Sequence, residues 1–389
     1  MERADLTLTA GPNPVSARVA AALGSPIQYH YDPVFQERFR DTERMVAEIF
    51  GTSSHEVILM QGEAILGLEA AARSLVREGT SCLNLVSGVF GKWFGFWLKD
   101  LGADLHELEV PYDQAVTGEA VDAYLTAHPE ISVVSVVHSE TPSGTLNPVW
   151  DIGPIARRHG AVTIVDCVSS WAGIELKPDE WQLDLLVAGP QKCLGGPPGM
   201  SLLAISDQAW AAIEANPDAP RGSFLSILDW RDTWHGKGSF PYTPSVSDLN
   251  GVHEACAQLL DEGLENSIAR HQRVFDACWA GVEGMGLQPW PESKDIGSAC
   301  ATAIHVPEGL TDIEVRDHVR KKYSVQISSG QTAGNLVRIG HLGATARPML
   351  MVAGLAALGQ GLADLGAKVD VGSGVAAAMS SLSASGGTD

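Results

Sequence analysis

The sequence predicts an α/β fold: a large domain with a mostly parallel sheet covered by helices, followed by a smaller C-terminal α+β domain. Continuous apolar runs of strand length alternate with helical stretches over the first part of the chain, as in sheets covered on both faces. This pattern changes after about residue 251, and 389 residues are too many for one ordinary core. We therefore expect two domains with a cleft between them.

The N-terminal arm is expected over residues 1–15, where Gly11-Pro12-Asn13-Pro14 predicts a turn before a helix from about Ser16. The large domain is expected over residues 16–255. A helix is predicted over Glu63–Glu78, where apolar residues recur at helical spacing. Another is predicted over Ile152–His159. Apolar runs of strand length are found at residues 82–86, 132–137, 161–165 and 183–188.

The small domain is expected over residues 256–371. A long, interrupted helical stretch over residues 252–280 leads into it, and shorter elements follow. These are a strand at residues 300–306, a helix at residues 311–322 and a strand ending near residue 328. Residues 372–389 are rich in Ala, Gly and Ser, so a flexible tail is expected there.

The composition excludes several kinds of partner. The chain has 26 Lys+Arg against 47 Asp+Glu, a formal charge of −21, which repels nucleic acid and anionic membrane surfaces. The N-terminus lacks a signal-peptide pattern, and no apolar run approaches the ~18 residues of a membrane helix. A cytoplasmic location is therefore expected. The six cysteines show no metal-ligand spacing and are expected to be reduced and mostly buried.

A polar cluster follows each predicted strand. These clusters are Ser87-Gly88, His138-Ser139-Glu140-Thr141, Asp166 and Gln191-Lys192. Ligands of open parallel sheets bind beyond the carboxyl ends of the strands, so the clusters are expected to converge on one site.

Lys192 and Asp166 are the first candidates for chemistry. Lys192 lies in a Gly/Pro-rich turn after a buried strand, where partial desolvation lowers the pKa of an amine and makes it a nucleophile for a carbonyl. Asp166 ends a buried strand, where its carboxylate can pair with a cation such as a protonated pyridine nitrogen. A surface-loop lysine and a helix N-cap aspartate are the ordinary alternatives.

The motifs around these two residues resemble those of the class V aminotransferases, which are fold type I pyridoxal phosphate-dependent enzymes. The resemblance extends over nearly the whole chain. It is carried, in order, by Leu8-Thr-Ala-Gly-Pro, Tyr31-Asp-Pro-x-Phe35, Gly62-Glu63, Gly67-Leu-Glu-Ala-Ala, Ser87-Gly-Val-x-Gly-Lys92, Thr141-Pro-Ser-Gly, Asp166-x-Val-Ser-Ser, Gly189-Pro-x-Lys-Cys-Leu-Gly-x-Pro-Pro-Gly, Thr243-Pro-Ser-Val and Arg338-Ile-Gly-His341.

The resemblance implies a homodimer or homotetramer in which Lys192 forms the Schiff base and Asp166 holds the protonated pyridine nitrogen. It also implies that Phe90 stacks on the ring, that Val168 packs on the opposite face, and that Thr141 lies near the ring hydroxyl. The ordinary alternative for Phe90 and Val168 is a place in the core.

Glu63 departs from the phosphate-binding members of the family. Their equivalent turn carries hydroxyl groups that surround the cofactor phosphate at a helix N-terminus, whereas this chain has Gln61-Gly62-Glu63-Ala64. A carboxylate a few ångströms from a phosphate is repelled by roughly 4 kcal/mol. Glu63 is therefore expected to disfavour pyridoxal phosphate and to accept a hydrogen bond from the free hydroxymethyl group. A glutamate that only caps the helix is the alternative.

Arg338 is expected to bind the carboxylate of an amino or keto acid, because a guanidinium matches a carboxylate bidentately. The alternative is a surface arginine on a strand. The pattern implied by the resemblance has a second arginine after Ser-Ser-Gly, where this chain has Gln331. The loop before Arg338 is also two residues shorter, so the chain departs from the implied pattern beside Arg338, where the vitamer and the acceptor are expected to bind.

The resemblance thus implies a reversible transamination in which pyridoxamine gives its amino group to pyruvate, yielding pyridoxal and L-alanine, with a role in vitamin B6 breakdown. The main alternative is a conventional pyridoxal phosphate-dependent alanine/serine–glyoxylate aminotransferase. Two further alternatives are a lyase and a non-catalytic vitamer-binding protein. The lyase is disfavoured because Gln191 stands where lyases have histidine. No metal is assigned, because His138 and His341 lack partners at metal spacing.

Overall fold

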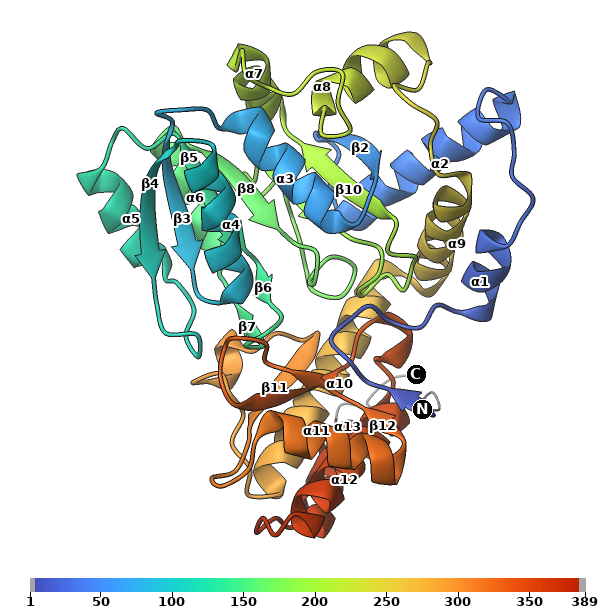
Figure 1. The fold of residues 1–389 in the computed structure, drawn as a ribbon, viewed down its shortest axis with the longest axis vertical. Helices are drawn as coiled ribbons and strands as arrows, with labels where there is room; N and C mark the ends of the chain where they lie inside the picture. Colours follow the sequence, from blue (N-terminus) through green and yellow to red (C-terminus); the bar gives the residue numbers. More distant parts are fainter. Residues whose placement is uncertain (1–3, 385–389) are drawn as a thin grey trace.

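The structure is a computed structural model that describes residues 4–384. A large domain built on one sheet lies at the top of Figure 1, and a smaller α+β domain lies below it. The predicted fold class is confirmed. Both described ends of the chain lie in the small domain.

The sheet of the large domain is mostly parallel. Its strands, in spatial order, are β2 (Glu56–Gln61), β10 (Met200–Ile205), β9 (Leu185–Ala188), β8 (Val162–Asp166), β5 (Val133–Val137), β3 (Ser81–Val86) and β4 (Asp104–Glu109). β10 is antiparallel to both neighbours, because a short loop returns the chain directly from β9. That loop carries Lys192, so its position is fixed by two buried strands.

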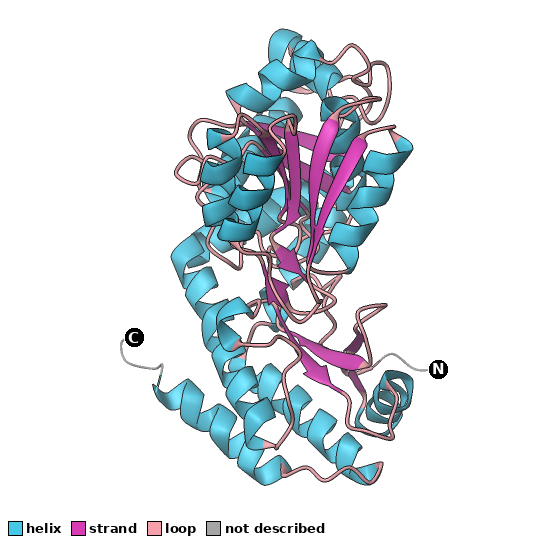
Figure 2. Cartoon of the chain, turned by 90° about the vertical axis from the view of Figure 1, so that its left-hand side faces the viewer, coloured by secondary structure: helices cyan, strands magenta, loops and turns pink. Residues whose placement is uncertain are grey.

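Helices cover both faces of this sheet, as Figure 2 shows. Helices α3 and α4 lie on the face toward the viewer in Figure 1, and α6 packs against β8. The helices of this domain are α1 (Ala17–Leu23), α2 (Pro33–Phe50), α3 (Ala64–Leu75), α4 (Val89–Asp100), α5 (Gly118–Ala127), α6 (Val149–Arg158), α7 (Asp207–Ala215), α8 (Ile227–Asp229), a π-helical turn (Trp230–His235) and α9 (Val246–Glu262).

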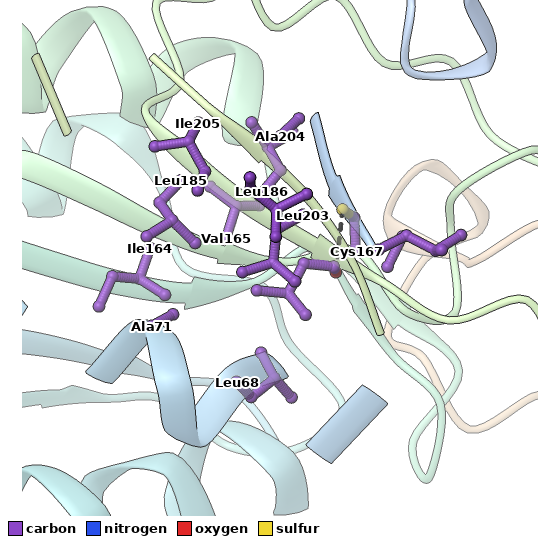
Figure 3. Packing of buried hydrophobic residues seen from close by; sticks show 14 of the residues in the cluster. Leu68, Ala71, Ile164, Val165, Cys167, Leu185, Leu186, Leu203, Ala204 and Ile205 are labelled. Carbon is purple, nitrogen blue, oxygen red and sulfur yellow. Dashed lines mark hydrogen bonds between the residues drawn. The ribbon is translucent and has the colours of Figure 1, made fainter. Parts of the chain in front are cut away.

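The apolar runs that predicted the strands form the core of the large domain. Every residue of β3, β9 and β10 is buried, as expected for strands covered on both faces. Figure 3 shows Leu68 and Ala71 on the side of α3 that faces strand residues such as Ile164 and Leu185. Fully burying one such leucine contributes roughly 1.5–3 kcal/mol, so this packing fixes α3 and its N-terminus.

The small domain has a second core against a three-stranded antiparallel sheet in the order β11, β14, β13. Its elements are α10 (Leu264–Gly284), β11 (Ala301–His305), α11 (Asp312–Tyr323), β12 (Val325–Gln326), β13 (Ser328–Ser329), β14 (Leu336–Gly340), α12 (Pro348–Asp364) and α13 (Val371–Ala384). Short 3-10 turns lie at Lys294–Ile296 and Gly343–Thr345. A hairpin of β6 (Ser139–Glu140) and β7 (Thr145–Leu146) extends from the large domain.

The structure differs from two expected segment boundaries. The boundary expected between residues 255 and 256 falls inside α9, whose buried residues as far as Leu259 belong to the first core. The break comes at Gly263, which adopts a φ of +90° that favours glycine. The flexible tail expected from residue 372 is instead the helix α13 as far as Ala384, because Ala378 and Leu382 are buried in the second core. Residues 385–389 lie outside the described part.

The N-terminal arm joins the two domains. β1 (Leu6–Thr7) pairs in parallel with β12, and Leu8 is fully buried in the second core. Beyond it, the amide of Asn13 donates to the carbonyl of Leu342 at 2.8 Å. Ser16 then caps α1, as its position before the predicted helix implied. Among residues 4–384, no helix has the length and apolar character that a membrane crossing requires.

Candidate active site

The predicted convergence of polar clusters is observed for Ser139, Asp166 and Lys192, which line one pocket, whereas Ser87 and Gly88 are not part of its lining. This pocket, with a cavity volume of about 90 Å³, lies at the carboxyl ends of β5 and β8, between α3, α4 and the loop after β9. Its lining includes Glu63, Ala64, Ile65, Leu68, Phe90, Ser139, Asp166, Val168, Ser169 and Lys192.

Lys192 reaches this pocket from the loop between β9 and β10. Its Nζ donates to the carbonyl of Ala10 in the N-terminal arm at 2.8 Å. Burial lowers the pKa of this amine, and the nearby positive charge of Arg338 lowers it further. The arm passes so close that a Cβ on Gly11 would lie 2.7 Å from Nζ, and Gly11 has a φ of +102°. Glycine is therefore required there, beside an amine that ionises less readily than an ordinary lysine.

Asp166 is the last residue of β8, and its carboxylate opens into the same pocket. Its Oδ1 accepts a hydrogen bond from the backbone N–H of Val168 at 2.9 Å. Burial raises the pKa of Asp166 from 3.8 to about 6, although the Val168 bond and the positive charge of Lys192 act in the opposite direction. The carboxylate is thus an acceptor that would gain from a buried cation.

Phe90 and Val168 both line the pocket and are half-buried. Phe90 lies in the first turn of α4, whose N-cap Gly88 provides no side-chain cap. The buried carboxylate of Glu140 fills this role, accepting from the N–H groups of Phe90 at 3.1 Å and Gly91 at 2.6 Å. Glu140 thereby fixes the position of Phe90 at the edge of the pocket.

Thr141 and Arg338 lie beside the pocket and contact each other. Nη1 of Arg338 donates to the carbonyl of Thr141 at 2.7 Å, and its Nε donates to the carbonyl of Ser329 at 2.6 Å. Arg338 is buried, and this burial lowers its pKa to about 10. The hydroxyl of Thr141 is hydrogen-bonded to that of Ser169, which does line the pocket. Arg338 thus connects the small domain to the rim of the site.

Glu63 is both a helix cap and a wall of the pocket. Its Oε2 accepts from the backbone N–H of Ile65 at 2.8 Å, which satisfies the first turn of α3. Its Oε1 accepts from Nε2 of Gln191 at 2.5 Å. Glu63 therefore does cap α3, as the alternative interpretation held. Its carboxylate also lines the pocket at the N-terminus of this helix.

Other predicted residues are placed less directly. Gln331 is exposed and has a φ of +54° in the turn between β13 and β14. His341 is fully buried, with its two ring nitrogens hydrogen-bonded to Thr302 and to the carbonyl of Ala299. His138 is also fully buried and bonds to the hydroxyl of Ser170 at 2.9 Å. Both histidines are structural neighbours of the site.

Sequence reasoning missed the roles of Glu140, Gln191 and Ala10. Glu140 acts on backbone N–H groups 50 residues away in the chain, and no spacing pattern marks such a contact. Ala10 acts through its carbonyl, which any residue possesses. Gln191 could have been found, because it directly precedes the candidate lysine in the loop that faces Glu63.

Comparisons with known proteins agree with this geometry. A family model described as Aminotransferase class-V matches residues 16–352. A protein of Mesorhizobium japonicum named pyridoxamine–pyruvate transaminase is 45% identical over 387 residues, covering 98% of each chain. The L-aspartate–glyoxylate aminotransferase of Paracoccus denitrificans is 32% identical over 379 residues, covering 95% of this chain and 94% of its own.

A solved structure extends the likeness to three dimensions. The crystal structure of pyridoxamine–pyruvate aminotransferase from Mesorhizobium loti matches this chain with a TM-score of 0.95 at 44% identity, covering 98% of both chains. The predicted resemblance is therefore confirmed over nearly the whole length. The chain belongs to the class V aminotransferase family, has its fold type I architecture, and is a transaminase.

Proposed function

We propose that this transaminase transfers the amino group of pyridoxamine to pyruvate, giving pyridoxal and L-alanine, and that the vitamer enters and leaves as a substrate. The observation that carries the proposal is the carboxylate of Glu63 at the N-terminus of α3, inside the pocket that holds Lys192. The protein of Mesorhizobium japonicum that is 45% identical is named for this reaction.

The position of Glu63 favours a vitamer without phosphate. A helix N-terminus attracts an anion through its free N–H groups and dipole, and here Glu63 already supplies that anion. A phosphate would meet a carboxylate held in place by Ile65 and Gln191. A neutral hydroxymethyl group could donate a hydrogen bond to the same carboxylate.

The pocket residues fit a pyridoxal-type ring. A buried carboxylate with a raised pKa matches a protonated ring nitrogen, so Asp166 would pair with that nitrogen. When bound, the ring serves as the electron sink for the amino-group transfer. Phe90 and Val168 supply apolar surface for its faces, and Thr141 supports Ser169 near its polar edge. Lys192 Nζ, with its lowered pKa, is the proposed base. It would move the proton from the carbon that carries the amino group in pyridoxamine to the carbon that receives the amino group in pyruvate.

Arg338 is proposed to bind the carboxylate of pyruvate. A guanidinium has five N–H groups, and two of them bond to the carbonyls of Thr141 and Ser329. These two bonds hold the guanidinium plane at the rim of the site. Binding of the acid therefore does not require further loss of side-chain conformational entropy at Arg338.

We further propose a homodimer or homotetramer that works in the cytoplasm. Several large apolar side chains are exposed on this chain, including Ile27 at 72%, Tyr29 at 67% and Val34 at 61%. Ile65 lines the pocket and is 47% exposed, so a second copy could cover this edge of the site. The six cysteines are free, in keeping with a reducing compartment. Size-exclusion chromatography with light scattering tests the assembly.

The proposal is tested by pyridoxal formation from pyridoxamine and pyruvate, using dialysed protein with no pyridoxal phosphate added. We expect turnover under these conditions. In Glu63→Gln the repulsion of phosphate falls, so binding of pyridoxal phosphate should tighten by up to about a thousandfold. Spectroscopic titration with both vitamers measures this change.

Glu69→Gln is the matched control, because Glu69 lies on the same helix and pairs with Arg73 at 2.8 Å. It should leave the ratio of the two affinities unchanged. A wild-type protein that requires added pyridoxal phosphate and uses only an amino acid with glyoxylate would contradict the proposal. It would then be a conventional pyridoxal phosphate-dependent aminotransferase.

A further inference from the structure

Two thiols face each other between the catalytic loop and the small domain. Cys193 directly follows Lys192, and Cys300 directly precedes β11. Their Sγ atoms lie 3.3 Å apart, and both side chains are buried. The proposed transamination uses neither thiol. We propose that this pair is an oxidant-responsive modification site, where hydrogen peroxide forms a disulfide that fastens the Lys192 loop to the small domain and stops turnover.

The geometry suits a disulfide. The bond needs the sulfur atoms at about 2.05 Å, so a closing movement of roughly 1 Å separates the two thiols from it. The residues are 107 apart in the chain, which makes the pair a connection between distant segments. Loop-closure entropy predicts that a crosslink over so long a loop constrains the unfolded chain strongly.

The two thiols differ in acidity. Burial opposes ionisation of Cys193, but a hydrogen bond from Cys300, the interactions with His271 and, to a smaller extent, the positive charge of Lys192 outweigh it, so the pKa of Cys193 lies below its usual value. Burial holds the pKa of Cys300 well above the usual value. Burial also raises the pKa of Cys82 and Cys278 to about 12. Cys193 is thus the thiol of the pair that ionises more readily, and Cys300 stays protonated.

A route for a small oxidant lies behind the loop. A cavity of about 470 Å³ between α1, α9 and α10 is lined by Cys193, Leu194 and Gly195. Arg18, Arg270 and Arg347 also line this cavity; Arg18 is paired with Glu254 and Arg270 with Glu262, each at 2.6 Å. Hydrogen peroxide is little larger than water, so it can approach the buried sulfur from this side.

The chemistry balances with hydrogen peroxide as the oxidant. The Cys193 thiolate attacks one peroxide oxygen, the O–O bond breaks, and the hydroxide that leaves takes up a proton to become water. The sulfenic acid formed at Cys193 is then attacked by the sulfur of Cys300, and a second water leaves. Two thiols and one peroxide thus give one disulfide and two water molecules.

The disulfide would disturb the site through the loop. In the reduced protein the Cys193 thiol donates to the carbonyl of Ser169 at 3.3 Å, and Ser169 lines the active-site pocket. Bond formation draws Cys193 toward Cys300 and breaks this contact. Because Lys192 directly precedes Cys193, its Nζ moves with the loop. A displacement of about 1 Å can reduce turnover by roughly a hundredfold.

The experiment exposes the full-length protein to hydrogen peroxide after removal of reductant. We expect the intact mass to fall by two hydrogens and a Cys193–Cys300 linked peptide to appear. Turnover should fall at least roughly tenfold, and dithiothreitol should restore it. The linked peptide is detected without any substrate, so this measurement tests disulfide formation independently of the proposed function.

Cys300→Ala and Cys300→Ser are the test variants, and Cys256→Ala, buried in α9, is the matched control. With Cys300 replaced, the reversible loss of turnover should disappear, whereas the control should behave as wild type. The idea is overturned if wild type loses activity without the linked peptide, or forms it with turnover intact. Loss and recovery in both Cys300 variants as in wild type would overturn it equally.

Discussion

At the residue scale, burial of the Asp166 carboxylate in the pocket lowers the stability of the fold. Its pKa rises from 3.8 to about 6 because burial disfavours its charge. In the protein without a bound ring, the folded state therefore holds a proton on Asp166 more tightly than the unfolded state does. The stabilisation from that proton is complete below about pH 4 and is lost as the pH rises through about 6.

Replacing Asp166 with asparagine should therefore stabilise the cofactor-free protein at neutral pH. The expected gain is roughly 1–3 kcal/mol at pH 8, shrinking toward zero near pH 4. Urea unfolding of wild type and Asp166→Asn at both pH values measures this difference. Turnover should fall steeply in the same variant, because an amide cannot pair with a protonated ring nitrogen. Equal stability at pH 8 would show that the carboxylate is not strained by burial.

Lys192 is the other residue on which the proposed mechanism depends. Lys192→Ala removes the amine proposed to move the proton, so only a trace of turnover should remain, measured as pyridoxal formation from pyridoxamine and pyruvate. Lys237→Ala, on an exposed lysine outside the pocket, is the control and should keep wild-type turnover. More than a trace of activity in Lys192→Ala would contradict the proposed mechanism.

The site was predictable from sequence where chemistry and chain position coincide. Glu63, Phe90, Asp166, Val168 and Lys192 all line the pocket, as expected from polar clusters at strand ends and from the family motifs. Thr141 and Arg338 were predicted as ligand contacts, and the structure places them at the rim, joined through a backbone carbonyl. Such carbonyl contacts leave no trace in the residue types, so the sequence could not reveal them.

At the scale of elements, the apolar runs predicted the strands because both faces of a parallel sheet are buried. The antiparallel direction of β10 was not predicted, since a buried run reads the same in either direction. The helix α13 was mistaken for a loose tail because its Gly, Ala and Ser residues suggest little burial. Those small residues are what allow close packing against α10.

The packing of α13 on α10 can be tested at Gly284. A Cβ on this residue would lie 2.8 Å from the Cβ of Ala377 and 3.1 Å from the Cα of Gly374. Gly284→Ala should therefore push α13 outward, at a cost of about 1–3 kcal/mol to its docking. Hydrogen exchange should show faster exchange across Val371–Ala384.

Gly372→Ala is the control, because a Cβ there meets its nearest atom only at 3.6 Å. Its exchange rates should match wild type or be slightly slower, since alanine favours helix more than glycine does. Unchanged protection of α13 in Gly284→Ala would mean that the two helices have room to adjust.

At the scale of the whole molecule, the N-terminal arm connects the two domains across the active site. Leu8 is buried in the core of the small domain, Ala10 accepts from Lys192, and Asn13 contacts the loop after β9. The arm was predicted as an extended segment before a helix. Its bridging role depends on contacts with residues some 180 to 330 positions away, which local sequence patterns do not encode.

Asn13 makes the connection testable, because its side-chain amide donates to the carbonyls of Leu342 at 2.8 Å and Lys192 at 3.3 Å. Asn13→Ala removes this donor, while the backbone N–H groups of Gly195 and Thr345 still donate to the two carbonyls, so the loss in urea unfolding should be about 0.5–1.5 kcal/mol. Turnover should fall as well, since the loop that carries Lys192 loses one of its anchors. Asn266→Ala removes a comparable but exposed bond to the carbonyl of Glu262 and should change stability by less than about 0.5 kcal/mol. If the two variants lose the same small amount of unfolding free energy, the arm contacts the site without stabilising it. The coupling between the domains must then depend on other contacts.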